Sequence, residues 1–119
     1  MLVADIHHVS LNVSDTGRAL AFYRDVLGMG PLPRPDLGFP GAWLDAGNGH
    51  QVHLIEGDVP AAHGQHVAFE VDDIAAAIDH LRGRGIDVRD AKPVGDTDVV
   101  QTFVHDPDGN LLELTQPPR

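Results

Sequence analysis

The chain of 119 residues contains no cysteine, few basic side chains and no long apolar segment. Without cysteine it can form neither disulfide bridges, nor a thiolate nucleophile, nor a cysteine-type zinc site. Its 8 lysines and arginines stand against 18 acidic residues, for a formal net charge of −10. Such a surface repels nucleic-acid phosphates and anionic lipids, so we expect no nucleic acid and no membrane as partners. The apolar runs fall short of the roughly 18 to 20 residues of a membrane helix, so we expect no spanning segment.

The beginning of the chain, MLVADIHHVS, has neither the basic region nor the cleavage site of a secretory signal. A cytoplasmic location is therefore the default expectation. The composition, with 42% apolar and 22% charged residues, is that of a globular domain that can bury its own core. The unusual feature is the histidine content: eight histidines occur, about three times the average usage.

The pattern of predicted elements occurs twice along the chain. Residues 66–85, HVAFEVDDIAAAIDHLRGRG, align with residues 8–27, HVSLNVSDTGRALAFYRDVL, and the first residue of each segment is a histidine. Each copy is typical of a strand, a helix and about three further strands, at about 5–57 and 64–116. We therefore predict an α+β fold in which one domain, residues 1–119, consists of two such repeats.

The individual elements follow from periodicity and from helix and turn signals. Ser14 or Asp15 is expected to cap the first helix, and Gly28 to end it. The sequence GNGH indicates a hairpin between two strands of the first copy. The predicted bounds are a helix at 16–27 and strands at 6–13, 41–46, 51–56, 66–71, 86–91, 99–106 and 111–116.

Alternation along these strands places four metal-binding side chains on the faces opposite the predicted core: His8, His53, His66 and Glu113. His8 and His66 occupy equivalent places in the two copies, as do His53 and Glu113. A single histidine on a strand is more often exposed or hydrogen-bonded than a ligand. Four donors at repeat-related positions instead favour a metal site. Three imidazoles and one carboxylate suit a divalent ion such as Zn, Ni, Co, Mn or Fe.

The same faces carry residues that we expect to line a substrate pocket. Glu70 shares the face of His66 and is better placed than Glu56 as a second carboxylate. Trp43 and Phe39 flank a loop rich in proline and glycine, and either an apolar ligand wall or core packing would explain them. The predicted pocket residues are Ser10, Asn12, Trp43, Glu70 and Phe103, and the predicted bystander histidines are His7, His50, His63, His80 and His105.

The segments HHVSLNVSD, FYRDVLG, QVHLIE, QHVAFEVDD and DPDGNLLEL resemble the vicinal oxygen chelate superfamily, from about Ile6 to Leu114. That superfamily includes glyoxalase I, fosfomycin- and bleomycin-resistance proteins, methylmalonyl-CoA epimerase and extradiol dioxygenases. The resemblance implies paired βαβββ modules with a curved mixed sheet around a cavity, and a homodimer whose sites are sometimes shared between chains. It places the metal on the same four residues, as a Lewis acid that stabilises an enolate or oxyanion, with Glu113 as the candidate catalytic base.

Two positions depart from the small bacterial glyoxalases that this chain resembles. Those enzymes usually carry Glu where His53 stands and tend to carry Arg where Asn12 stands, which weakens the expectation of a glutathione adduct. The expected function is a metal-dependent, glyoxalase-like lyase or isomerase acting on a small oxygen-chelating substrate. The alternatives are a non-catalytic dimer that binds a small molecule or drug, and an extradiol-type dioxygenase with non-haem iron.

Overall fold

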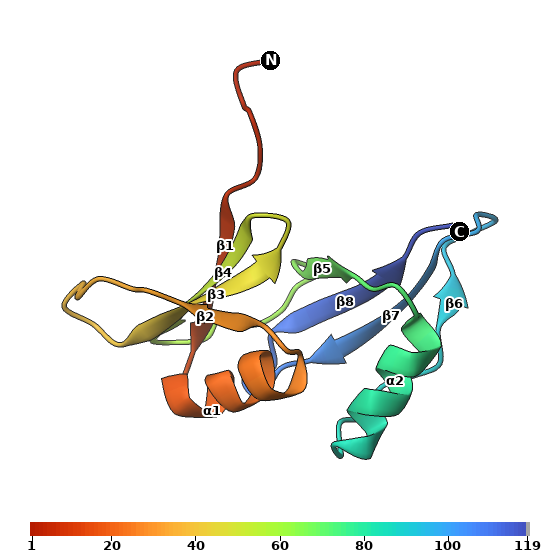
Figure 1. Ribbon diagram of the computed structural model, residues 1–119. Coiled ribbons are helices and arrows are strands. Elements are labelled where there is room, and N and C mark those ends of the chain that lie inside the picture. The colour runs from red at the N-terminus through yellow and green to blue at the C-terminus, as the bar shows by residue number, and fades with distance from the viewer. Residues whose placement is uncertain (119) are drawn as a thin grey trace. The chain divides into compact units, whose positions relative to one another are not determined.

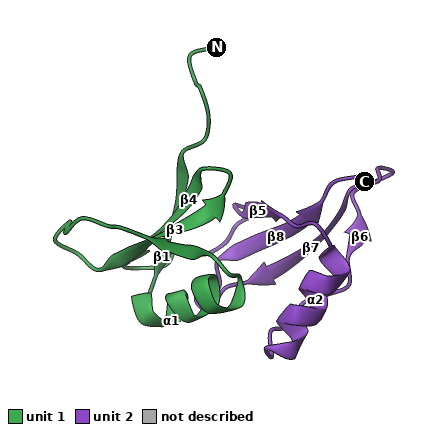
Figure 2. Cartoon of the chain, in the orientation of Figure 1, with its two compact units in different colours: residues 1–60 green, residues 61–119 purple. Residues whose placement is uncertain are grey.

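The computed structural model describes residues 1–118, and its chain divides into two compact units, Met1–Pro60 and Ala61–Arg119 (Figures 1 and 2). In each unit one strand and a helical segment precede three further strands. The units also share one strand order, with the first strand of each unit at one edge of its sheet, beside the last. The predicted α+β class with two βαβββ modules is confirmed.

Unit 1 contains a four-stranded mixed sheet in the order β1-β4-β3-β2. The pair β1/β4 is parallel, and the pairs β3/β4 and β2/β3 are antiparallel. The helical segment α1 lies against β3 and β4. The elements are β1 (His8–Val13), α1 (Thr16–Leu20), the π-helical turn η1 (Ala21–Val26), β2 (Gly30–Leu32), β3 (Gly41–Gly47) and β4 (His50–Glu56).

Unit 2 repeats this arrangement with the strand order β5-β8-β7-β6. Here β5 and β8 are parallel, and the other pairs are antiparallel. The helix α2 buries three apolar side chains and lies against β8. The elements are β5 (Val67–Glu70), α2 (Ile74–Gly83), β6 (Lys92–Pro93), β7 (Val100–His105) and β8 (Leu111–Gln116).

Both helices begin in the same way. The carboxylate of Asp15 accepts a hydrogen bond from the backbone N–H of Arg18 at 2.8 Å, and Asp73 accepts one from Ala76 at 3.1 Å. These bonds satisfy helix N–H groups that have no partner within the helix. Asp15 rather than Ser14 is therefore the cap of the first helix.

The first helix differs from the prediction of one α-helix over 16–27. From Ala21 the turns widen, and the N–H of Leu27 donates to the carbonyl of Phe22, five residues earlier, at 2.9 Å. The rings of Phe22 and Tyr23 are buried in this wide turn and meet edge to face, 5.1 Å apart. The helix ends before Gly28, whose φ of 82° is the left-handed conformation that glycine adopts readily.

The predicted hairpin between β3 and β4 is present. Asn48 and Gly49 form its turn with φ of 53° and 80°. Two successive left-handed residues are typical of a type I′ turn, whose twist matches that of the flanking strands. The turn places Gly47 opposite His50, and a register shift between Asp45 and Gly47 then pairs Trp43 with His53.

The prediction of a strand at 86–91 is wrong. This segment is not part of a sheet, and the ladder at this edge consists of Lys92 and Pro93 opposite Gln101 and Val100. Side chains bind its carbonyl groups instead: the Arg82 guanidinium donates to the Val88 carbonyl at 2.8 and 3.1 Å. The Thr102 hydroxyl likewise donates to the Arg89 carbonyl at 2.8 Å. These bonds replace the ladder of a strand.

Each unit buries the apolar face of its own sheet under its own helix. In unit 1, Val52 and Leu54 of β4 are almost fully buried, and in unit 2 so are Leu112 and Leu114 of β8. This confirms the core faces predicted from alternation, and it leaves the residues between them on the opposite faces. No helix within residues 1–118 is long and apolar enough to cross a membrane.

Candidate metal centre

The two candidate ligands of unit 1, His8 and His53, are in direct contact. Ser10 and Trp43 are the neighbours of His53 on the two adjacent strands, so they share its face of the sheet. The His53 ring stacks on His8 with centroids 3.9 Å apart and planes at 16°. It also stacks on the Trp43 indole, at 4.4 Å and 7°. His53 therefore lies within a column of three aromatic rings.

This packing leaves His53 only 8% exposed, which changes its acid–base chemistry. Burial lowers the pKa of His53 below its ordinary value, and the neighbouring positive charges of His8, His7 and Arg34 lower it further. Its Nε2 lies 2.8 Å from the Gln51 side-chain oxygen. Because that oxygen can only accept, Nε2 carries the proton in this arrangement and Nδ1 holds the lone pair.

The two candidate ligands of unit 2, His66 and Glu113, also touch. His66 Nε2 lies 3.0 Å from Glu113 Oε1, and the Glu113 side chain is only 13% exposed. On the other side of the ring, Nδ1 donates to the Gly64 carbonyl at 2.9 Å. The bond to Gly64 and then the contact with Glu113 raise the pKa of His66 above its ordinary value, although burial opposes them.

The hydrogen bond to Gly64 tests whether this pair fits a metal ion. Because a carbonyl oxygen only accepts, the Nδ1 proton is fixed and Nε2 is the nitrogen that faces Glu113. A neutral imidazole would then present a lone pair to a carboxylate oxygen, which is favourable only when a proton or a metal cation lies between them. Metal-ligating histidines commonly donate their other ring N–H to a carbonyl in this way. The His66–Glu113 pair thus fits a divalent cation.

The structure brings the four predicted ligands together as two pairs, one in each unit. No group of three His, Asp or Glu side chains arranged to hold a metal occurs in the part of the chain that the structure describes, residues 1–118. The pairs follow the internal repeat. His8 begins the first strand of unit 1, and His66 directly precedes the first strand of unit 2. His53 and Glu113 lie on the last strands of their units. The four-ligand site itself stays a prediction.

The five predicted pocket residues lie in different surroundings. Trp43 packs on His53, and Ser10 is exposed beside it. The Asn12 amide donates to the Asp58 carbonyl at 2.8 Å, so one of its hydrogen-bonding groups is engaged locally. Phe103 is opposite Glu113 in the sheet and meets the His66 ring edge-on at 5.4 Å. Glu70 is exposed on β5.

Glu56, the less favoured second carboxylate, has a structural role. Its Oε1 accepts the N–H of Thr16 at 3.0 Å, at the start of α1. Gln116 does the same for Ile74 at the start of α2, at 2.8 Å. Both side chains lie on the helix-covered faces of their sheets, so Glu56 is not on the face of His53.

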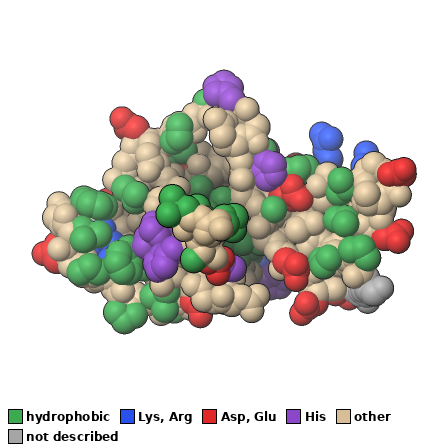
Figure 3. Space-filling model, turned by 90° about the horizontal axis from the view of Figure 1, so that it is seen from above, with side chains coloured by type: hydrophobic (Ala, Val, Ile, Leu, Met, Phe, Trp, Pro, Cys, Tyr) green, Lys and Arg blue, Asp and Glu red, His purple; other side chains and the backbone are tan. Residues whose placement is uncertain are grey.

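The predicted bystander histidines are mostly exposed. His7 Nδ1 lies 2.9 Å from His8 Nδ1, and His50 lies 3.4 Å from Asp5, a long contact. Figure 3 shows histidine side chains at the surface, together with acidic groups spread over the visible face and few basic ones. None of these contacts supplies a third donor to either candidate pair.

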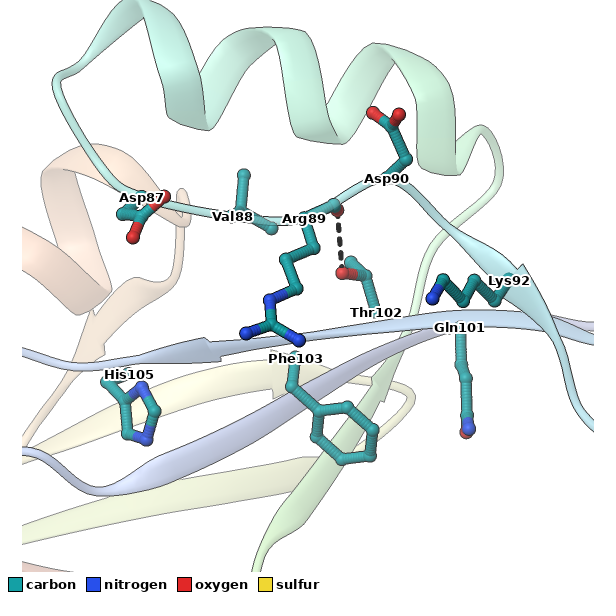
Figure 4. A pocket seen from close by; sticks show the side chains of 9 residues that line it. All are labelled: Asp87, Val88, Arg89, Asp90, Lys92, Gln101, Thr102, Phe103 and His105. Carbon is teal, nitrogen blue, oxygen red and sulfur yellow. Dashed lines mark hydrogen bonds between the residues drawn. The ribbon is translucent and has the colours of Figure 1, made fainter.

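Sequence reasoning missed a pocket of about 400 Å³ in unit 2. It lies between the segment preceding β6 and the strand β7 (Figure 4). Only an indirect signal was present, because the segment 86–91 has the composition of a strand. The lining residues are Asp87, Val88, Arg89, Asp90, Lys92, Gln101, Thr102, Phe103 and His105.

The paired βαβββ units correspond to a known family. The profile of the Glyoxalase/Bleomycin resistance protein/Dioxygenase superfamily matches residues 5–114. The chain belongs to this superfamily, which confirms the resemblance inferred from its motifs.

Individual relatives include both enzymes and a binding protein. The chain is 37% identical to a lactoylglutathione lyase of Haemophilus influenzae, over 93% of this chain and 91% of that protein. A Bacillus anthracis protein assigned to the glyoxalase family has a TM-score of 0.88 at 27% identity, covering 98% of each chain. TnmS3, an antibiotic binding protein from Streptomyces sp. CB03234, has a TM-score of 0.82 at 25% identity, again covering 98% of each chain.

Proposed function

We propose that this protein is a metal-dependent lyase or isomerase of the glyoxalase type, acting as a homodimer on a small substrate that offers two neighbouring oxygen atoms. His8 and His53 of one unit and His66 and Glu113 of the other, from one chain or from two copies, would hold one divalent ion: Zn, Ni, Co, Mn or Fe. The observation that carries the proposal is the geometry of His66, whose Nδ1 donates to Gly64 while Nε2 faces Glu113. The similarity to lactoylglutathione lyases supports it.

The roles of the side chains follow from their chemistry. The bound ion would supply Lewis-acid stabilisation of negative charge developing on a substrate oxygen. Gly64 holds the His66 ring in one orientation and one tautomer. Glu113 is the candidate proton acceptor, because its carboxylate is mostly shielded from water and touches a single imidazole. Trp43 restrains the His53 ring by stacking.

The first test is elemental analysis of tag-free protein purified without chelator. We expect about one equivalent of a divalent metal per chain, lost in His66→Ala and in Glu113→Gln. His63→Ala is the matched control, because His63 is exposed. The emission of Trp43, the one tryptophan in the sequence, should change as metal is added, because its indole stacks on His53.

Activity is then assayed with the same variants on lactoylglutathione and on a panel of small molecules with adjacent oxygens. We expect turnover that depends on the added metal and is lost in His66→Ala. Full metal content together with full activity in His66→Ala would refute the proposal. Iron as the native metal, with oxygen uptake on catechols, would favour the dioxygenase alternative.

A second candidate function is non-catalytic binding of a small molecule. Two observations favour it: His53 is already packed between Trp43 and His8, and the fold is similar to that of an antibiotic binding protein. On this hypothesis a ligand would bind equally well with and without chelator, and no product would form. Failure to take up any of the five metals would make this the leading function.

A further inference from the structure

The pocket beside β7 contains two cationic side chains that have no partner among residues 1–118, those of Arg89 and Lys92. The Arg89 guanidinium and the Lys92 ammonium make no hydrogen bond or ion pair with any described residue. Two other arginines of the chain are engaged in ion pairs: Arg24 with Asp25 at 2.8 Å, and Arg82 with Asp90 at 2.9 Å. In a chain of net charge −10, both of these cations line one pocket.

The acidic residues at the pocket do not cancel this charge. Asp90 already forms an ion pair with Arg82, which does not line the pocket. Asp87 lies at the end of the pocket away from Lys92, near His105 (Figure 4). Arg89 and Lys92 therefore remain able to donate charge-assisted hydrogen bonds to an anionic group in this pocket.

The edge of the sheet creates the space for a ligand. Because β6 pairs only with Val100 and Gln101, the edge of β7 that faces away from β8 has no strand beside it from Thr102 to His105 within the described chain. Figure 4 shows the Arg89 side chain crossing this edge towards Phe103, with Lys92 on one side and His105 on the other. The Phe103 ring is 40% exposed and offers a flat apolar surface.

We propose that this pocket binds a small aromatic carboxylate, with the carboxylate between Arg89 and Lys92 and the ring against Phe103. Arginine and lysine supply charge-assisted hydrogen bonds to a carboxylate, and an aromatic ring stacks on another with modest gain. The volume of about 400 Å³ lies in the range of small-molecule pockets. Neither cation belongs to the candidate metal ligands, although Phe103 also meets the His66 ring, so this pocket adjoins the candidate ligand pair of unit 2.

The test is a titration of the full chain with 2-naphthoate in buffer containing chelator. The backbone amide signals are monitored by NMR at each step. We expect the largest shifts at residues 87–92 and 101–105, and binding at least about tenfold weaker for the neutral 2-naphthamide. Arg89→Gln and Lys92→Gln should each weaken naphthoate binding by about tenfold. Because both side chains are exposed and make no bonds, both variants should unfold at the same temperature as the parent protein.

The matched control is Arg84→Gln, which makes the same change of charge at another exposed position of unit 2 and should leave the affinity unchanged. Equal affinity for the amide would overturn the proposal, as would full naphthoate affinity in Arg89→Gln and Lys92→Gln. Shifts confined to unit 1, or no binding up to about 1 mM, would overturn it as well.

Discussion

The imidazole rings of His8 and His53 stack with their centroids 3.9 Å apart, although the two residues are separated by most of unit 1 in sequence. The parallel pairing of β1 with β4 produces this contact, because it places Ser10 opposite His53 and His8 two residues before it. In unit 2 the parallel pairing of β5 with β8 brings His66 to Glu113 in the same manner. One topological feature, used twice, creates both candidate ligand pairs.

The burial of His53 and the hydrogen bonds of His66 predict opposite titration of these two residues in metal-free protein. NMR titration of the ring protons should show the pKa of His53 below its ordinary value of 6.5 and that of His66 above it. His66 thus stabilises the fold at acidic pH, and this contribution is lost as the pH rises through its folded pKa. His53 acts oppositely: its contribution is lost as the pH falls below 6.5 towards its folded pKa.

Variants separate the two effects. Urea unfolding in the presence of chelator should show that His66→Gln loses more stability at pH 5 to 6 than at pH 8, relative to the parent. For His53→Gln, the decrease in the free energy of unfolding on acidification should instead be smaller than in the parent protein. Coincident titration of the two rings near 6.5 would contradict the buried and hydrogen-bonded environments described above.

Trp43 should control the environment of His53. Trp43→Leu removes the stacked indole, so we expect the pKa of His53 to rise towards its ordinary value and the free energy of unfolding to fall by about 2 kcal/mol. Trp43→Phe keeps an aromatic ring and should retain most of both effects. Ring-proton titration and urea unfolding measure the two quantities, and an unchanged His53 pKa in Trp43→Leu would show that the stacking does not bury the ring.

Gly41 should be the most sensitive glycine of the first sheet. A Cβ at this position would overlap the backbone carbonyl oxygen of Leu54 on the neighbouring strand β4. Gly41→Ala should therefore destabilise the protein by about 1 to 3 kcal/mol, since the strands must separate. Gly30→Ala on β2 is the matched control, because a Cβ there meets nothing within 4 Å. Equal unfolding midpoints for the two variants would exclude the overlap.

The helix caps provide a test of the internal repeat. Asp15→Ala and Asp73→Ala each remove a side-chain acceptor at a helix start, and each should cost about 1 kcal/mol. Asp79→Ala, in the exposed part of α2, removes the same charge without removing a cap. Thermal or urea unfolding should distinguish the caps from this control, and a cost at Asp79 as large as at Asp73 would refute the capping role.

Local patterns in the sequence were sufficient to predict most of the fold. Alternation along the strands identified Val52 and Leu54 as core and His53 as the residue between them, because successive strand side chains point to opposite faces. The cap was readable as Ser14 or Asp15, and the hairpin turn at Asn48 was readable too, since each depends on a few adjacent residues. The repeat predicted two similar modules before any contact was known.

Other features depend on contacts between residues far apart in the chain. The segment 86–91 has the composition of a strand, yet the side chains of Arg82 and Thr102 bind its carbonyl groups, and the sheet edge opens into a pocket. In the same way, Trp43 determines the burial of His53, and Gly64 determines the tautomer of His66. The sequence by itself thus determined which residues face away from the core. Only the tertiary structure decided their neighbours and protonation, because both depend on hydrogen bonds and packing across strands.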